Sequence, residues 1–115
     1  NTSFYGGIYA DEGVKYIRMA AEQGDASAQN NLATCYYNGT GVDKDEEEAV
    51  EWYRKAAEQG LVSAQKRLAK CYEDGIGVER NGTEALKWLN MDGKPTKTPY
   101  SPVEMSFEEF AYDIE

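Results

Sequence analysis

The most constraining feature of this sequence is an internal repeat with a strict period of 36 residues. The block Ala-Ala-Glu-Gln-Gly at residues 20–24 recurs unchanged at residues 56–60. Many single positions agree at the same spacing: Ala28 with Ala64, Gln29 with Gln65, Leu32 with Leu68, Cys35 with Cys71, Gly39 with Gly75, Ala49 with Ala85 and Trp52 with Trp88. A fixed period of about 20 to 50 residues is typical of solenoids, whose units bury their apolar faces only against neighbouring units.

Apolar residues within each unit have helical spacing. Those from Ala28 to Tyr36 lie on one helix face, and those from Ala49 to Ala57 form the stripe of a second helix. Helices are therefore expected near residues 11–23, 26–38, 46–59, 62–74 and 82–91. Paired alanines let neighbouring helices approach closely, while larger side chains are expected to fill the gaps between them. These larger residues are Trp52, Tyr53, Trp88 and Leu89.

Capping residues mark the ends of the expected helices. Asp45 with Glu48, and Asn81 with Glu84, have the spacing of a capping box, in which side chain and backbone satisfy each other. Glycines stand where helices would end in a left-handed residue. They are Gly24, Gly39, Gly60 and Gly75. The unit is therefore a pair of antiparallel helices.

The repeated motif resembles the Sel-one-like repeat (SLR) family of the tetratricopeptide-like superfamily. The carrying residues are Leu32-Ala33 to Tyr36, the Gly-x-Gly-Val connection at residues 39–42 and residues 49–60, with a further copy from Leu68. The likeness covers about residues 11–92. Ala33 and Ala69 depart from it, because the family usually has Gly there. The resemblance implies an all-α, right-handed superhelix of helix pairs that serves as an adaptor scaffold for other proteins.

Charge and composition narrow the classes of function. The net charge of -9 disfavours nucleic acid as a partner, because phosphate binding draws on clustered Lys and Arg. The lack of His removes the commonest general base and metal ligand, so we expect no enzyme. No apolar run approaches the roughly 20 residues that span a bilayer. No secretion signal is visible, which favours a cytoplasmic location and leaves a trimmed signal peptide as an open alternative.

Neither a cofactor nor a metal is expected. The two Gly-x-Gly fragments at residues 39–41 and 75–77 follow no strand, so they are interpreted as turns rather than phosphate loops. Cys35 and Cys71 are too few for a closed zinc site. Equivalent positions on stacked helices lie about 8 to 10 Å apart, beyond the usual reach of a disulfide. Both thiols are therefore predicted to be reduced packing residues.

A change in pattern divides the chain into a repeat stack at residues 1–92, a Pro-rich extended linker at residues 93–105 and an acidic amphipathic helix at residues 106–115. So short a helix needs a cover. We expect the apolar side chains of Phe107, Phe110 and Ile114 to dock on an exposed face around Trp88 and Leu89. The alternative is docking on a second copy or a partner, which would make the chain a self-associating structural module.

The helices that carry Leu32 and Leu68 are expected to line the concave wall of the stack. Side chains projecting from them form the candidate site for a protein or peptide partner. They are Asn30, Thr34, Tyr37, Lys66, Lys70 and Glu73. Lys66 and Lys70, one turn apart, are expected to hold a carboxylate of the partner. The alternative interpretation is an ordinary solvated helix face.

Overall fold

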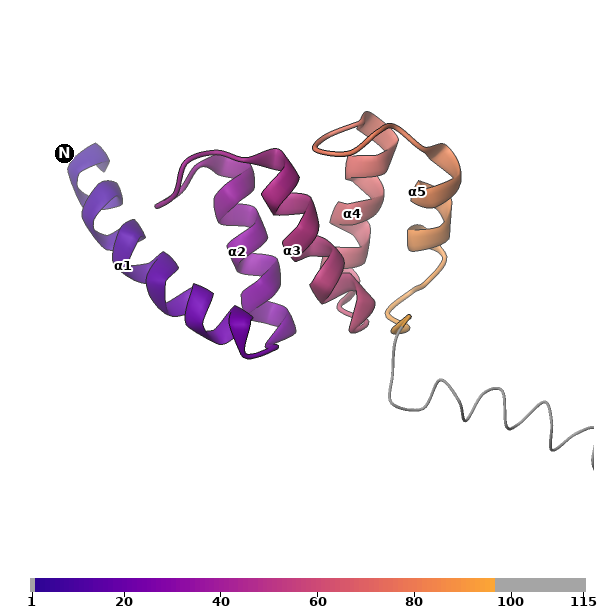
Figure 1. The fold of residues 1–115 in the computed structure, drawn as a ribbon, viewed down its shortest axis with the longest axis horizontal. Helices are drawn as coiled ribbons and strands as arrows, with labels where there is room; N and C mark the ends of the chain where they lie inside the picture. Colours follow the sequence, from indigo (N-terminus) through magenta and orange to yellow (C-terminus); the bar gives the residue numbers. More distant parts are fainter. Residues whose placement is uncertain (1, 97–115) are drawn as a thin grey trace, which may run out of the picture.

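The chain forms a row of helices, each packed on the one before it (Figure 1). The computed structural model describes residues 2–96, with side chains from residue 12 onward. The helices of this part are α1 (Thr2–Glu22), α2 (Ala26–Asn38), α3 (Glu46–Glu58), α4 (Val62–Asp74) and α5 (Gly82–Leu89). Within the described residues, this confirms the predicted all-α stack of sequentially packed helices.

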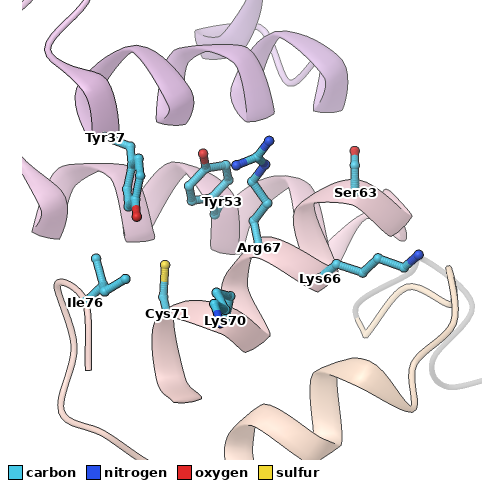
Figure 2. Close-up of a pocket in the computed structure, with 8 residues that line it drawn as sticks. All are labelled: Tyr37, Tyr53, Ser63, Lys66, Arg67, Lys70, Cys71 and Ile76. Carbon is cyan, nitrogen blue, oxygen red and sulfur yellow. The ribbon is translucent and has the colours of Figure 1, made fainter. Parts of the chain in front are cut away.

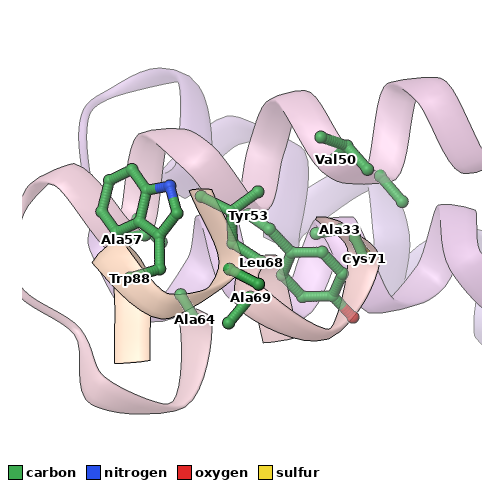
Figure 3. Packing of buried hydrophobic residues seen from close by; sticks show 12 residues of the cluster. Ala33, Val50, Tyr53, Ala57, Ala64, Leu68, Ala69, Cys71 and Trp88 are labelled. Atoms are coloured by element: carbon green, nitrogen blue, oxygen red, sulfur yellow. The ribbon is translucent and has the colours of Figure 1, made fainter. Parts of the chain in front are cut away.

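Small and large side chains alternate in the core between the helices (Figure 3). Ala33, Ala57 and Ala64 are completely buried, and Tyr53 and Leu68 fill the space beside them. Because an alanine lets two helix backbones approach closely, the neighbouring large side chains can reach across the gap. A second cluster joins α1 to α2. Its buried members are Val14, Ala21, Ala28 and Leu32.

Side-chain caps begin α3 and α5 as predicted. The carboxylate of Asp45 accepts a hydrogen bond from the Glu48 backbone N–H at 3.1 Å, and the Asn81 side chain accepts one from Glu84 N–H at 3.1 Å. The reciprocal half of the capping box is absent from the described contacts. Instead, the Asp45 N–H donates to the Tyr36 carbonyl at 2.8 Å, so the cap residue is tied to the preceding helix.

Glycines end α2 and α4 in the predicted left-handed conformation. Gly39 and Gly75 have φ angles of 74° and 71°, and the N–H of each donates to a carbonyl of the helix that it ends. Gly77 also has a positive φ of 69° and lies directly against α3. A Cβ at Gly77 would collide with the carbonyl oxygen of Glu46. The Gly-x-Gly motif therefore serves both turn geometry and close packing.

Buried glutamines hydrogen-bond one helix of the stack to the helix before it. The Gln29 side chain donates to the Ala21 carbonyl at 3.1 Å and accepts a hydrogen bond from Gln59 Nε2 at 2.9 Å. Gln65, its repeat equivalent, donates to the Ala57 carbonyl at 3.0 Å. An amide side chain supplies a donor and an acceptor, so one residue satisfies backbone and side-chain groups together.

At the C-terminal end of the stack, the Gln65 side chain is bound by backbone groups of residues 93 and 94. The equivalent Gln29 side chain is bound by the Gln59 side chain instead. Gly93 N–H donates to Gln65 Oε1 at 2.7 Å, and Gln65 Nε2 donates to the Lys94 carbonyl at 2.8 Å. Thr96 N–H donates to the Glu58 carbonyl at 3.0 Å. The first four residues of the expected linker, residues 93–96, are therefore fastened to α3 and α4. The rest of the linker and residues 106–115 lie outside the described residues.

Arginine–tyrosine pairs recur between the helix pairs. Arg54 donates to the Tyr72 hydroxyl at 2.7 Å and lies 5.5 Å from the centroid of its ring. Arg18 makes the same two interactions with Tyr36, its guanidinium lying 5.4 Å from the ring centroid. A guanidinium over an aromatic face gains cation–π attraction. These pairs fix α1 on α2 and α3 on α4 in the same manner.

Two helices differ in length from the prediction. α1 begins at Thr2 rather than near residue 11, because glycines such as Gly6 and Gly7 weaken a helix by about 1 kcal/mol each without forbidding it. α5 ends at Leu89, and Asp92 and Gly93 that follow have positive φ angles of 51° and 84°. Non-helical backbone at Asp92 and Gly93 keeps α5 shorter than α3, and Pro95 stands at the repeat position of Gln59.

The exposed apolar residues of α5 differ from those predicted, which were Trp88 and Leu89. Trp88 is 3% exposed and packs inward as a member of the main core (Figure 3), whereas Trp52 at the equivalent repeat position is only partly buried. Leu89, expected to fill a gap between helices, is 51% exposed, and Leu86 is 62% exposed. The apolar surface at this end of the described stack is thus formed by Leu86 and Leu89.

Candidate functional site

A largely apolar hollow of the described part lies between α2 and α4 (Figure 2). It has a volume of about 390 Å³. Its lining comes from the C-terminal end of α2, from one face of α4 along most of its length, from α3 and from the connection after α4. The lining residues are Tyr37, Tyr53, Ser63, Lys66, Arg67, Lys70, Cys71 and Ile76. We call this hollow the α2–α4 groove.

Tyr53 forms the floor of the groove and is held in one orientation. Its hydroxyl lies 2.8 Å from Thr34 Oγ1, which itself donates to the Asn30 carbonyl at 3.1 Å. Since the single Thr34 proton is used in that bond, the Tyr53 hydroxyl is the donor to Thr34. Burial raises the pKa of Tyr53, and its hydrogen bond with Thr34 only partly offsets this. The floor is therefore rigid and uncharged at neutral pH.

The basic side of the groove comes from α4. Arg67 rises from this helix toward the Tyr53 ring, whereas Lys66, which also lines the groove, extends its side chain away from Arg67 and Tyr53 (Figure 2). Lys70 is engaged elsewhere, since its ammonium lies 3.3 Å from an Asp74 carboxylate oxygen and 3.7 Å from one of Glu73. Within residues 12–96, no ion pair joins Lys66 or Arg67 to an acidic group. The positive charge that the groove offers a ligand therefore comes from Lys66 and Arg67.

Cys71 contributes an inert thiol to the floor. Its side chain is buried, and desolvation raises its pKa to about 11. A thiol with that pKa is protonated at neutral pH and a poor nucleophile. Cys35 is half-buried in the other cluster, and both cysteines are free thiols, in agreement with the packing role predicted for them.

The six residues predicted for the concave wall fall into three groups. Tyr37, Lys66 and Lys70 line the α2–α4 groove together. Thr34 and Asn30 lie behind it, where Thr34 supports Tyr53 and the Asn30 side-chain oxygen is buried without a hydrogen-bond partner. Glu73 faces α5 and lines a different hollow. Whether any of these residues contacts a partner stays a prediction.

Sequence reasoning missed two lining residues, Ser63 and Arg67, that are visible in their spacing from the predicted Lys66 and Lys70. Ser63, Lys66, Arg67 and Lys70 follow one another as i, i+3, i+4 and i+7, which places them on one face of α4. Ile76 and Tyr53 reach the groove from other elements, so only the packing of α3 and of the connection after α4 reveals them. The missed arginine matters most, because it replaces Lys70 as an available cation.

Other kinds of site find no support in the described part. Among residues 12–96, no three His, Cys, Asp or Glu side chains gather closely enough to ligate a metal ion. None of the described helices has both the length and the apolar character needed to cross a bilayer. For the tail-docking prediction, Phe107, Phe110 and Ile114 lie outside the described residues, whereas Trp88 is buried and Leu89 is exposed.

Family and structure comparisons agree with the repeat found in the sequence. The family model described as Sel1 repeat matches residues 10–25, 26–61 and 62–91. These segments together cover well over half of the chain, and their boundaries fall at the starts of α2 and α4. No curated protein matches the chain.

Two solved structures are similar to this chain. A Sel1 repeat protein from Oxalobacter formigenes has 43% sequence identity and a TM-score of 0.71 over 72% of this chain. A protective antigen of uropathogenic Escherichia coli that displays an SLR fold has 44% identity and a TM-score of 0.70 over 71% of this chain. The match accounts for only 34% of the first protein and 18% of the second, so both are much longer than the shared region.

Proposed function

Because this chain belongs to the Sel1 repeat family, whose repeats typically mediate protein interactions and are typically non-catalytic, we propose that it is an adaptor that binds a peptide segment of a partner protein. The binding site is the α2–α4 groove, on the concave face of a right-handed superhelix. The observation that carries the proposal is the meeting of a rigid aromatic floor, Tyr53, with two cations, Lys66 and Arg67, in one hollow.

The chemistry of the groove defines the kind of peptide that it fits. Tyr37, Tyr53 and Ile76 offer apolar and aromatic surface to a side chain of the ligand. Arg67 and Lys66 offer charge-assisted hydrogen bonds to a carboxylate. A short segment that carries an Asp or Glu next to an apolar residue satisfies both. The positive groove in a chain of net charge -9 would also repel basic segments and so contribute to specificity.

A peptide array with systematically varied acidic and apolar positions tests this proposal. Binding peptides are then titrated in solution against the intact chain and a Lys66→Glu, Arg67→Glu variant. We expect the variant to bind at least tenfold more weakly, because each lost charge-assisted contact contributes about 1.5 to 3 kcal/mol. A Tyr37→Ala variant should weaken the same peptides without changing their charge preference.

The matched control reverses two exposed cations outside the groove. Lys15→Glu with Lys44→Glu changes the net charge by the same amount and leaves the groove intact. This control should bind the peptides as the unmodified chain does, within about twofold. Equal weakening in both double variants would show that only the overall charge matters, and unchanged binding in the groove variant would refute the proposed site.

The alternative function is self-association, in which the tail of one chain docks on a neighbouring copy. The exposed apolar side chains Leu86 and Leu89 favour it. Sedimentation across a concentration series, with the intact chain and a chain ending at Thr96, tests this alternative. The cut follows Thr96 because residues 93–96 hydrogen-bond to α3 and Gln65. A monomer in both forms at all concentrations rules the alternative out.

A further inference from the structure

The exposed face of α5 occupies the place where the repeat would put another helix. Leu86 and Leu89 stand at the repeat positions of Val50 and Tyr53, each of which is 1% exposed. Val50 and Tyr53 are buried in the core that α3 shares with α4 and with the connection after it. Within the described residues, nothing equivalent follows α5. Its outer face is therefore an apolar surface shaped for a helix.

A hollow with one basic residue lies along this face. It is lined by Glu73, Arg80, Gly82, Thr83, Ala85, Leu86 and Leu89. Arg80 forms no ion pair with an acidic residue of the described part. The carboxylates of Glu73 and Asp74 at the end of α4 pair with Lys70 instead. An occupant with an apolar side and an acidic side would fit the leucines and the guanidinium at the same time.

Residues 106–115 of the same chain have this composition. At helical spacing, Phe107, Phe110 and Ile114 lie on one face, and acidic residues occupy the remainder. The acidic residues are Glu108, Glu109, Asp113 and Glu115. A helix of about ten residues is not stable alone in water, so it needs a surface to cover its apolar side.

The described chain ends where this segment can reach α5. Thr96 is hydrogen-bonded to the Glu58 carbonyl, at the junction of α3 and α4. Residues 97–105 contain two of the three prolines and, in an extended path, span about 28 Å. The eight residues of α5 extend over only about 12 Å. The connection is therefore long enough to bring residues 106–115 to any point of the α5 face.

We propose that residues 106–115 dock as a helix on the Leu86–Leu89 face of α5 in the same molecule and close the end of the stack. Docking within one molecule is favoured over docking between molecules because a short linker gives an effective concentration in the millimolar range. Phe107, Phe110 and Ile114 contact Leu86 and Leu89, and the acidic face meets Arg80. Trp88 takes no part, since it is already buried. This inference is independent of the proposed peptide groove.

Hydrogen exchange of the intact chain tests the docking. We expect the amides of residues 106–115 to exchange at least tenfold more slowly than the same peptide alone, at every protein concentration. Leu86→Asp with Leu89→Asp should abolish that protection and leave exchange in α2, α3 and α4 unchanged. Met19→Asp is the matched control, because Met19 on α1 is as exposed as Leu89, at 51% each. It should leave the tail protected.

A cysteine pair tests the geometry of the same contact. Leu86→Cys with Phe110→Cys, in a background of Cys35→Ser and Cys71→Ala, should form an intramolecular disulfide under mild oxidation. The product is a monomer of unchanged mass apart from two lost hydrogens. Disulfide-linked dimers, or tail protection that rises with protein concentration, would overturn docking within one molecule in favour of exchange between copies. Unprotected tail amides in the unmodified chain would overturn docking of either kind.

Discussion

α3 and α5 are copies of one helix in two different surroundings. Each begins at a side-chain cap of the same geometry, and each carries an alanine and a tryptophan at matching positions. They differ on the outer face, where Val50 in α3 is 1% exposed and Leu86 in α5 is 62% exposed. The local sequence therefore determines that a helix forms, whereas the next unit along the chain determines how much of it is buried.

The largest difference in the free energy of unfolding is expected between Tyr53 in α3 and the equivalent Leu89 in α5. Tyr53→Ala is expected to lower the free energy of unfolding by about 3 to 5 kcal/mol, because it leaves a cavity in the centre of the core. When both variants are made in a chain that ends at Thr96, Leu89→Ala at the equivalent position should cost less than half as much, since no residue up to Thr96 encloses Leu89. Urea denaturation followed by circular dichroism measures both.

A conservative variant separates packing from hydrogen bonding at the same site. Tyr53→Phe removes only the hydroxyl that lies 2.8 Å from Thr34, so a loss of about 1 kcal/mol is expected. Equal losses for Tyr53→Ala and Leu89→Ala would contradict the comparison. That result would mean that the outer face of α5 is as tightly packed as that of α3.

An intermediate effect is expected at the two buried glutamines. Gln65→Ala leaves the Gly93 N–H and the Lys94 carbonyl without partners and removes one of the hydrogen bonds to the Ala57 carbonyl, so it should cost about 1 to 3 kcal/mol. Gln29→Ala should cost less, because its partner Gln59 has an exposed side chain that can turn to water. Denaturation of the two variants gives the difference, and faster hydrogen exchange at residues 93–96 should accompany only Gln65→Ala. A larger loss for Gln29→Ala would contradict this ranking.

Most of the fold could be predicted because the repeat supplies many independent copies of one signal. Asp45 and Asn81 mark helix starts by local chemistry, and Gly39 and Gly75 mark helix ends, so neither needs tertiary information. The N-terminal extension of α1 has no counterpart in the repeat. For that reason the period could not indicate where this helix begins.

The candidate site could be predicted only in part, because it depends on how side chains are shared among neighbours. Tyr37 and Lys66 were found by their place on a helix face. Lys70 was expected to bind a carboxylate of the partner, but it pairs with Glu73 and Asp74 of its own helix. These ion pairs depend on the rotamers of three side chains, which the sequence does not show. Arg67 was missed although its spacing was visible, because its role depends on the approach of Tyr53 from another helix.

The smallest effect should be the same in both helices, which makes it the sharpest test of the comparison. Asp45→Ala and Asn81→Ala each remove one cap hydrogen bond of 3.1 Å, and each should cost about 1 kcal/mol. A cap acts on its own first turn, so burial at the far end of the helix should not change its contribution. Thermal denaturation should show matching decreases in Tm. If Asn81→Ala is clearly milder, α5 is already frayed in the folded chain, and the contrast with α3 then extends from its outer face to its backbone.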